Sequence, residues 1–230
     1  MPALHLRNKR LDLDRPISRL FFQTEKSMGV APHQHSPEDI LAIKLALPEQ
    51  LERLKRASRE HPMPTLAERR TQLTKLKRAL LAHKEQLCTA LAQDYGQRSH
   101  YDSQIADILP CIMQINYTQK RLKRWMQPHR RHAGLLLAPA KVEVHFQPLG
   151  VVGIIVPWNF PVMLSLGPLI TAIAAGNRAM LKLSEFTPHT NAVLRTLLTT
   201  TFNEDEIAVI EGDAQMAAAR SEERRVGKEC

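Results

Sequence analysis

The chain of 230 residues is 43% hydrophobic and 24% charged, a composition that indicates a globular protein and excludes disordered or fibrous classes. Nine glycines and fifteen prolines also exclude a collagen-like or Gly/Pro-rich repeat. The three cysteines are an odd number without close spacing, which excludes a disulfide framework and predicts a reducing, cytoplasmic location.

The net charge of +9 is unevenly distributed along the chain. Residues 1–133 contain 24 Lys or Arg and 13 Asp or Glu, whereas residues 134–230 contain 8 and 10. A basic half can bind nucleic acid or a membrane surface, but it is more often the solvated surface of helices. We favour solvated helices and predict neither a nucleic-acid nor a membrane partner.

Residues 1–47 show little hydrophobic periodicity and no signal peptide, so we expect a flexible leader there. The histidines at 33 and 35 lack further ligands nearby, and no metal site is expected. Residues 144–177 contain no Lys, Arg, Asp or Glu, which would allow a membrane span. Four prolines interrupt this stretch, and we expect buried core instead.

Residues 48–133 are predicted to form a helical segment. A short amphipathic helix is expected over 48–59, and a longer one follows, with Thr65 as N-cap and Glu68 completing a capping box. Leucines continue at helical spacing to Leu91, and Gly96 is expected to end this helix in a left-handed conformation.

A third helix is expected over residues 101–126, with Pro110 kinking or splitting it. Cys88 and Cys111 fall inside these helices and are expected to be small buried groups. One face of the third helix is predicted to be apolar and consists of Ile105, Ile108, Ile112, Ile115 and Leu122.

Residues 134–219 are predicted to form a partial α/β domain. After a half-exposed strand at 141–146, apolar strands alternate with helices, which indicates a parallel sheet that helices cover on both faces. The fold class is therefore α/β, with N-terminal helices followed by the first βαβαβ part of a doubly wound sheet. The expected elements are strand 151–156, helix 162–175, strand 179–183, helix 188–201 with Thr187 as N-cap, and strand 207–210.

Ligands bind such sheets beyond the carboxyl ends of the strands, which directs attention to residues 157–161, 183–186 and 211–213. Asn159 lies between two prolines, where its amide could donate to a developing negative charge or merely cap the next helix. Spacing alone leaves these two roles equal. Lys182 and Glu185 could bind the two hydroxyls of a ribose, but taken alone they favour an exposed ion pair.

Three separated motifs carry a family resemblance. They are the run QPLGVVGIIVPWNFP at 147–161, AGNR at 175–178 and LKLSE at 181–185. In this order they resemble the aldehyde dehydrogenase superfamily over residues 48–219, and the Arg124-Trp125-Met126 lead-in is similar to its coniferyl-aldehyde branch. The resemblance implies an enzyme that oxidises an aldehyde to its carboxylic acid with NAD or NADP. Aromatic aldehydes are the substrates that the branch implies, and a homo-oligomer is implied for the complete enzyme.

The resemblance also implies roles for individual residues. Asn159 would be the catalytic amide that holds the oxyanion of a thiohemiacetal. Lys182 and Glu185 would bind the adenosine ribose of the cofactor, although Leu183 stands where the family usually has proline. The other implied cofactor-binding residues are Ile155, Pro157 and Trp158, which would line the cleft, and Gly212, where the adenine pocket would begin. Because a carboxylate at the ribose should repel a 2′-phosphate, Glu185 favours NAD over NADP.

Three further family motifs do not occur in the sequence: Gly-Gln-x-Cys with the nucleophile, Leu-Glu-Leu-Gly-Gly with the base, and a Gly-Ser-x-x-x-Gly loop. We therefore expect an N-terminal part of such an enzyme that is inactive by itself. Residues 220–230 are highly charged and are interpreted as foreign to the fold, with a natural charged tail as the alternative.

A different class of function also remains open. Residues 50–131 could form a basic helical module that binds an acidic partner such as nucleic acid, through the basic residues between 120 and 131. Few aromatic residues accompany this cluster, so stacking on bases has weak support. We rank this function below the enzyme.

Overall fold

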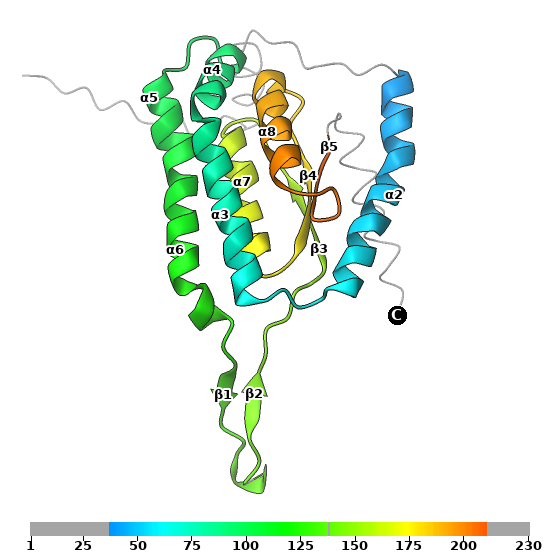
Figure 1. Ribbon diagram of the computed structural model, residues 1–230, viewed down its shortest axis with the longest axis vertical. Coiled ribbons are helices and arrows are strands. Elements are labelled where there is room, and N and C mark those ends of the chain that lie inside the picture. Colours follow the sequence, from blue (N-terminus) through cyan, green and yellow to red (C-terminus); the bar gives the residue numbers. More distant parts are fainter. Residues whose placement is uncertain (1–36, 138, 211–230) are drawn as a thin grey trace, which may run out of the picture.

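The computed structural model describes residues 37–137 and 139–210 (Figure 1). The expected leader up to residue 36, Gly212 and the charged tail lie outside the described residues. The helices are α2 Pro37–Glu60, α3 Leu66–Ala82, α4 Lys84–Asp94, α5 His100–Ser103, η1 Gln104–Ile108, α6 Leu109–Trp125, η2 Leu135–Leu137, α7 Pro161–Ala174 and α8 Pro188–Thr201. The strands are β1 His129–Arg131, β2 Val142–Val144, β3 Val151–Ile155, β4 Arg178–Lys182 and β5 Ile207–Ile210.

Strands β3, β4 and β5 form a parallel sheet in that order. Each connection between neighbouring strands is a helix, first α7 and then α8, so the predicted βαβαβ order is confirmed. Because successive crossovers in the same direction share the right-handed sense, α7 and α8 lie on the same face of the sheet. The amino-terminal helices followed by a parallel sheet are the predicted fold class.

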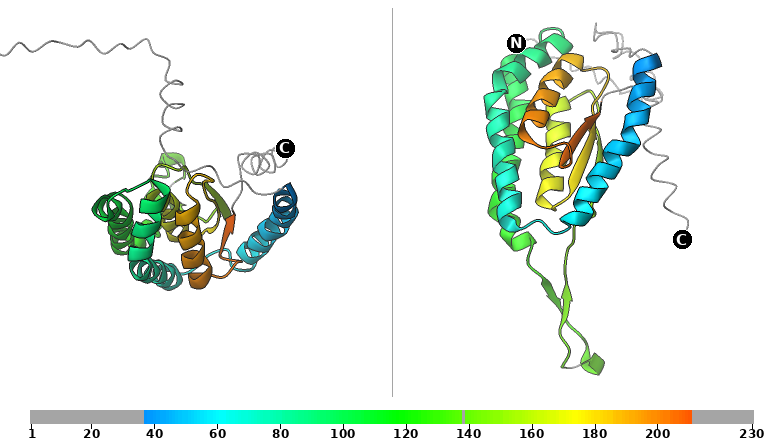
Figure 2. Two further views of the ribbon diagram at one scale, coloured as in Figure 1. Left: turned by 90° about the horizontal axis from the view of Figure 1, so that it is seen from above. Right: turned by 45° about the vertical axis from the view of Figure 1, so that its right-hand side comes forward.

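The described elements stack in layers, as the view from above in Figure 2 shows. Helix α2 covers one face of the sheet, α7 and α8 cover the other, and α3, α4 and α6 pack outside them. Helix α7 is therefore sandwiched between the sheet and the outer helices, which explains why its sequence is apolar all round and carries no charge. The expectation of buried core for the uncharged stretch is confirmed for α7, but it was wrong for its first residues, where Phe146 is 64% and Leu149 87% exposed. No helix within the described residues is long and apolar enough to span a membrane.

Helix α2 begins at Pro37, earlier than the start expected at residue 48. Pro48 lies within the helix instead of opening it. Leu47 and Leu54, one on each side of this proline, are both buried against Met180, Ala208 and neighbouring residues of the sheet. Tertiary packing of an apolar stripe thus outweighs the helix-breaking tendency of proline.

The capping box at Thr65 is confirmed, since the Thr65 Oγ1 atom accepts from the Glu68 N–H and a Glu68 carboxylate oxygen accepts from the Thr65 N–H. The leucine stripe does not form one helix, because the chain breaks at His83 between α3 and α4. Gly96 has φ +59° as expected. The Gln97 N–H bonds back to the Ala92 carbonyl, which is the hydrogen bond of a Schellman motif.

The third expected helix contains a π-helical turn, η1, between α5 and α6. Pro110 falls in the first turn of α6, directly after η1, where its missing N–H removes no hydrogen bond within α6. The wider turn also rotates the apolar face. Ile108, Ile115 and Leu122 are buried, but Ile105 is 46% exposed and Asp107 takes the buried position instead. The prediction was therefore wrong for Ile105.

Strands β1 and β2 pair antiparallel in a hairpin that projects away from the layers (Figure 1). The strand expected at 141–146 was predicted to be half-exposed, but all three residues of β2 are exposed. Apolar and polar residues alternate along β2, but neither face of the strand is buried by other described residues.

Candidate functional site

The predicted site residues lie beyond the carboxyl ends of β3 and β4. These two strands are neighbours in the sheet, and Ile155 at the end of β3 is the register partner of Lys182 at the end of β4. The ladder continues one step further, because the Val156 N–H donates to the Lys182 carbonyl at 2.9 Å. Pro157 and Trp158 follow directly after this pair, so the structure brings the segments predicted from β3 and β4 to one edge of the sheet.

Asn159 lies in the loop between β3 and α7, and it is exposed. Its side chain makes no hydrogen bond to any described residue, and it does not cap α7, whose N-cap position is Phe160. Of the two roles left open by the sequence, helix capping is therefore excluded by the structure. An exposed amide without a hydrogen-bond partner among the described residues has its N–H donors free for a bound group.

Lys182 and Glu185 form an ion pair, with 2.6 Å between the Lys182 Nζ and Glu185 Oε2 atoms. Spacing alone had favoured an exposed ion pair. In the structure the pair is largely shielded from solvent, since the Lys182 side chain is only 5% exposed and that of Glu185 is 17% exposed. A buried pair of this kind carries a desolvation cost that an exposed pair avoids. The pair lies at the carboxyl end of β4, which is where other parallel sheets bind their ligands. A desolvation cost at such a position is consistent with a ligand-binding role.

The loop between β4 and α8 is held by its own side chains. The Asn191 Nδ2 atom donates to the Ser184 carbonyl at 2.6 Å, and the Thr187 hydroxyl contacts the Asn191 Oδ1 atom at 3.2 Å. Thr187 occupies the predicted N-cap position, but its side chain caps no N–H group of α8. Asp94 does this instead, since its two carboxylate oxygens accept from the N–H groups of His189 and Thr190 at 3.1 and 2.8 Å.

Helix α7 is capped in the same way by a second aspartate. Asp107 in η1 is completely buried, and its Oδ1 atom accepts from the Met163 N–H in the first turn of α7 at 3.0 Å. Its Oδ2 atom lies 2.8 Å from the Arg98 Nη2 atom. Burial raises the pKa of Asp107, while the hydrogen bond from Met163 and the Arg98 charge act in the opposite direction.

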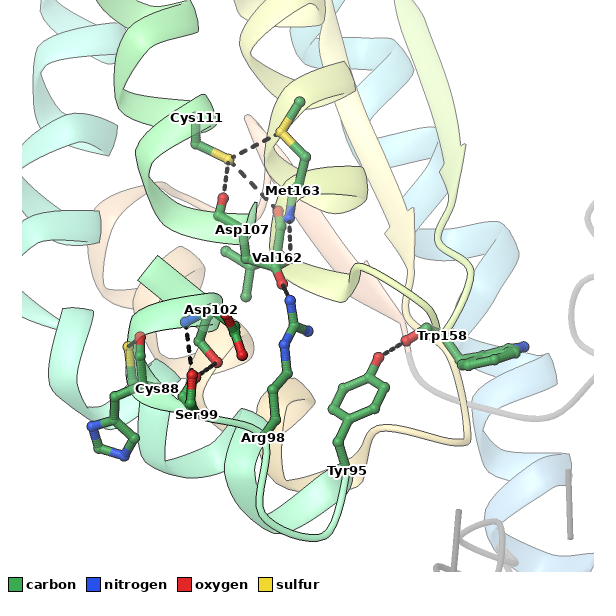
Figure 3. A network of polar contacts seen from close by, with 12 residues as sticks. Cys88, Tyr95, Arg98, Ser99, Asp102, Asp107, Cys111, Trp158, Val162 and Met163 are labelled. Carbon is green, nitrogen blue, oxygen red and sulfur yellow. Dashed lines mark hydrogen bonds and ion pairs between the residues drawn. The ribbon is translucent and has the colours of Figure 1, made fainter. Parts of the chain in front are cut away.

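Arg98 and Tyr95 extend this network to the loop that carries Asn159, as Figure 3 shows. The Arg98 guanidinium carbon lies 5.3 Å from the centre of the Tyr95 ring and 5.4 Å from that of Phe160. The Tyr95 hydroxyl donates to the Trp158 carbonyl, and burial raises the pKa of this tyrosine. Side chains from the segment 94–107 thus reach both sides of Asn159.

The opposite end of α7 is held by Arg69 of α3, which is buried. Its Nη1 atom donates to the Ala174 carbonyl at 3.0 Å, and its Nε atom donates to the Pro64 carbonyl at 2.9 Å. The chain leaves α7 through Gly176 at φ +83°, directly beside this guanidinium. A carboxylate at the amino end and a cation at the carboxyl end both complement the dipole of α7.

Neither described cysteine lies in the candidate site as an available nucleophile. Cys88 and Cys111 are both buried, as expected from the sequence. Burial raises the pKa of Cys88, and it raises the pKa of Cys111 to about 12. Because the thiolate is the reactive form of cysteine, burial disfavours the reactive form of both groups.

Sequence reasoning missed Asp94, Tyr95, Arg98 and Asp107 as residues that support the two loops. Asp107 lies off the apolar face predicted for this helix, so the pattern gave no signal that this carboxylate would be buried and would need a partner. The identity of that partner could not be inferred, because Met163 lies 56 residues further along the chain.

Other features of the described residues lie away from this edge. A cavity of about 350 Å³ opens at the amino ends of β4 and β5, at the opposite end of these strands from the candidate site. The basic residues 120–131 are at the end of α6 and in β1, where most are exposed. Within 37–137 and 139–210, no group of three or more His, Cys, Asp or Glu residues could hold a metal ion.

Residues 33–228 match the family model described as "Aldehyde dehydrogenase family". A probable coniferyl aldehyde dehydrogenase of Pseudomonas aeruginosa is 45% identical over 160 residues, which are 70% of this chain and 34% of that protein. The coniferyl aldehyde dehydrogenase of Pseudomonas sp. is 40% identical over 168 residues, or 73% of this chain and 34% of that protein.

A solved structure of Staphylococcus aureus AldH in a substrate-bound state has a similar fold, with a TM-score of 0.72 and 32% identity. The similarity covers 74% of this chain and 37% of that one. The chain thus spans about a third of the length of the curated relatives that it matches.

Proposed function

Because the chain belongs to the aldehyde dehydrogenase family, we propose that it forms part of an enzyme that oxidises an aldehyde to its carboxylic acid with NAD or NADP. One observation carries the proposal: an exposed Asn159 amide and a buried Lys182–Glu185 pair occupy the carboxyl ends of neighbouring strands. The names of the relatives favour an aromatic aldehyde of the coniferyl type as the substrate.

In this proposal Asn159 is the group that stabilises negative charge on the aldehyde oxygen. Its amide is exposed and has no hydrogen-bond partner among the described residues, so it needs to break no contact in order to donate. An amide does not titrate, and it therefore keeps its donor at every working pH. A donor at this position would contribute by stabilising charge that develops in the transition state.

The cofactor is proposed to lie along the ends of β3 and β4, and when bound it would accept a hydride from the substrate. The described donor set fits a ribose, because Lys182 supplies N–H donors and Glu185 supplies acceptors for two adjacent hydroxyls. The Leu183 N–H already bonds to the Ile210 carbonyl at 3.0 Å and is not free to contribute. Ile155, Pro157 and Trp158 would line the cleft, and Gly212 is proposed from the sequence alone.

We propose NAD as the preferred cofactor, although NADP is also open. The Glu185 carboxylate is fixed by Lys182, and a second negative charge on a 2′-phosphate would be placed beside it. Because Lys182 alone cannot neutralise both the Glu185 carboxylate and a 2′-phosphate, NADP is expected to bind more weakly than NAD.

The 230 residues are proposed to be inactive by themselves. Neither Cys88 nor Cys111 can act as a thiolate, because both are buried and have raised pKa values. If neither described thiol acts as the nucleophile, the Asn159 amide has no covalent adduct of these cysteines to stabilise. With any aldehyde and NAD, the chain is expected to give no increase in NADH absorbance.

The remaining parts of the proposal concern organisation and setting. Residues 48–133 are proposed as a helical segment that supports a partial cofactor-binding domain at 134–219. The complete enzyme is proposed to be a cytoplasmic homo-oligomer, in keeping with the unpaired thiols and with the two-stranded hairpin that projects from the layers.

The experiment that tests this function uses a graft. Residues 37–210 replace the matching third of the coniferyl aldehyde dehydrogenase from Pseudomonas sp., and NADH formation from coniferyl aldehyde is followed. In the grafted enzyme, Asn159→Ala is expected to lower kcat by about 10²–10³. Asn203→Ala, which changes another exposed asparagine at the far end of the sheet, is the matched control and should leave kcat unchanged.

Glu185→Gln tests the cofactor assignment in the same graft. The ratio of kcat/KM for NAD to that for NADP is expected to fall, because the repulsion of the 2′-phosphate is removed. An unaltered kcat after Asn159→Ala would refute the oxyanion role. An unaltered cofactor ratio after Glu185→Gln would refute only the stated basis of the NAD preference.

A further inference from the structure

The loop between β3 and α7 has few degrees of freedom of its own. Pro157 and Pro161 fix φ at its two ends, which leaves the backbone of Trp158, Asn159 and Phe160 to set its shape. The Asn159 side chain is exposed and makes no hydrogen bond to a described residue that could orient it. The direction of its amide therefore depends on how the two neighbouring residues are held.

Both neighbours, and the helix after them, are held from one short segment of the chain. The Trp158 carbonyl accepts from the Tyr95 hydroxyl, and the Phe160 ring lies against the Arg98 guanidinium. Asp107 pairs with Arg98 and also accepts from Met163, in the first turn of α7. These contacts hold the loop before Asn159, after it, and at the start of the helix. Figure 3 shows Tyr95 beside Trp158, and Asp107 near Arg98 and Met163.

The three side chains also depend on one another. Arg98 lies between the Tyr95 and Phe160 rings and places its charge on the buried Asp107 carboxylate. Its side chain is only 14% exposed, so little solvent screens this pair. The Arg98 guanidinium thus links both rings to the buried carboxylate, and through Phe160 it also holds the loop.

We propose that Tyr95, Arg98 and Asp107 are positioning residues that hold the loop Trp158–Phe160 and thereby aim the Asn159 amide. The effect on catalysis rests on the proposed function of Asn159, whereas the holding of the loop does not. None of the three side chains contacts the reacting atoms in this proposal. They act through the backbone on either side of Asn159.

The first test measures hydrogen exchange in the full 230-residue chain by mass spectrometry. In Tyr95→Phe, which removes one hydroxyl and no ring, amides of residues 158–164 are expected to exchange about fivefold faster. Amides of residues 183–190, in the loop after β4, should exchange at the wild-type rate. Tyr117→Phe, which removes the same atom from an exposed ring on α6, is the matched control and should change neither segment.

Conservative rescue separates positioning from general support. Arg98→Met is expected to loosen residues 158–164, and Arg98→Lys should restore part of the protection, because an ammonium can still pair with Asp107. Asp107→Asn keeps an acceptor for Met163 but leaves Arg98 without a counter-charge, and it should loosen the same segment.

In the grafted enzyme, Tyr95→Phe is expected to lower kcat about tenfold while the KM for NAD is unchanged, because misaligned donors cost rate more than cofactor affinity. Wild-type exchange in Tyr95→Phe, or equal acceleration of both segments, would overturn the inference. If Asn159→Ala leaves kcat unaltered, the proposed function fails, and the exchange result still decides whether the three residues hold the loop.

Discussion

Helices α7 and α8 follow successive strands of one sheet, yet their first turns and the loops before them are stabilised differently. The loop before α8 is held by Ser184, Thr187 and Asn191, all within a few residues of one another. The loop before α7 is held by Tyr95 and Asp107, which are 63 and 56 residues away from their partners. One loop can form from local contacts, whereas the other needs the outer helices to be in place.

Both helices nevertheless receive an aspartate from the same segment, and neither supplies a side-chain cap of its own. Asp94 caps α8 and Asp107 caps α7. The difference is that Asp107 is also paired with an arginine in the interior, so that its loss leaves a buried charge uncompensated. The comparison therefore predicts unequal effects of equivalent substitutions.

The largest effect is expected from Asp107→Leu. It leaves the Arg98 guanidinium without its counter-charge and the first turn of α7 without an acceptor, which should lower the free energy of unfolding by about 3–5 kcal/mol. Urea denaturation followed by circular dichroism measures this. The double variant Asp107→Leu with Arg98→Met should recover part of the loss, and a double variant no more stable than the single one would contradict the pairing.

A smaller loss is expected at the other end of α7 from Gly176→Ala. The backbone there has φ +83°, and an added Cβ would lie 2.6 Å from the Arg69 Nη2 atom. The strain should cost about 1–3 kcal/mol of unfolding free energy in the same urea assay. Gly96→Ala is the matched control, since it also has positive φ (+59°) but no atom within 4 Å of the added Cβ. Equal costs for the two variants would show that Arg69 is not crowded.

Asp94→Ala is expected to cost about 1–2 kcal/mol, which is the value of a helix N-cap without a buried counter-charge. The side-chain contacts of Ser184, Thr187 and Asn191 remain and keep the loop in place. Asp102→Ala changes an exposed aspartate of the same segment and serves as control. A cost as large as that of Asp107→Leu would remove the distinction between the two loops.

The smallest effect is on the pH dependence of the free energy of unfolding, which should have opposite signs for a surface carboxylate and a buried one. Hydrogen bonds from Thr65 lower the pKa of Glu68 to about 2, so its contribution is present above pH 4.5 and is lost as pH falls toward 2. Burial raises the pKa of Asp107 above 3.8, so its ionisation makes the unfolding free energy fall as pH rises from 3.8. Urea titrations of Glu68→Gln and Asp107→Asn between pH 3 and 7 should deviate from the wild type with opposite slopes. Slopes of the same sign would contradict one of these pKa directions.

The sequence predicted the sheet and its helices well because their signals are local. Residues 151–210 alternate between apolar β-branched runs and helical patterns, and the predicted helix at 188–201 has the observed bounds. The ends of β3 and β4, and therefore Asn159 and Lys182, follow from that alternation. The sequence also predicted the capping box at Thr65, since all of its groups lie within four residues.

The features that the sequence did not predict depend on contacts between distant residues. The π-turn η1 leaves Ile105 exposed and Asp107 buried. This arrangement is stabilised by the hydrogen bond that the Asp107 carboxylate accepts from Met163 in the first turn of α7. The burial of the Lys182–Glu185 pair likewise follows from the sheet around it and not from the three-residue spacing. The continuation of α2 through Pro48 also depends on Leu47 and Leu54, which are buried only because the sheet lies against them.

The capping of α7 from outside also bears on the order of synthesis. Arg69 and Asp107 leave the ribosome before any residue of α7, so both of its partners are already available when the helix emerges. A circular permutant that begins at β3 and carries α2 to α6 at its carboxyl end would reverse this order. In this permutant α7 would be synthesised before Arg69 and Asp107, and its apolar surface would stay exposed to water until they emerged. We therefore expect a lower yield of native protein on synthesis, even where the equilibrium stability is unaltered.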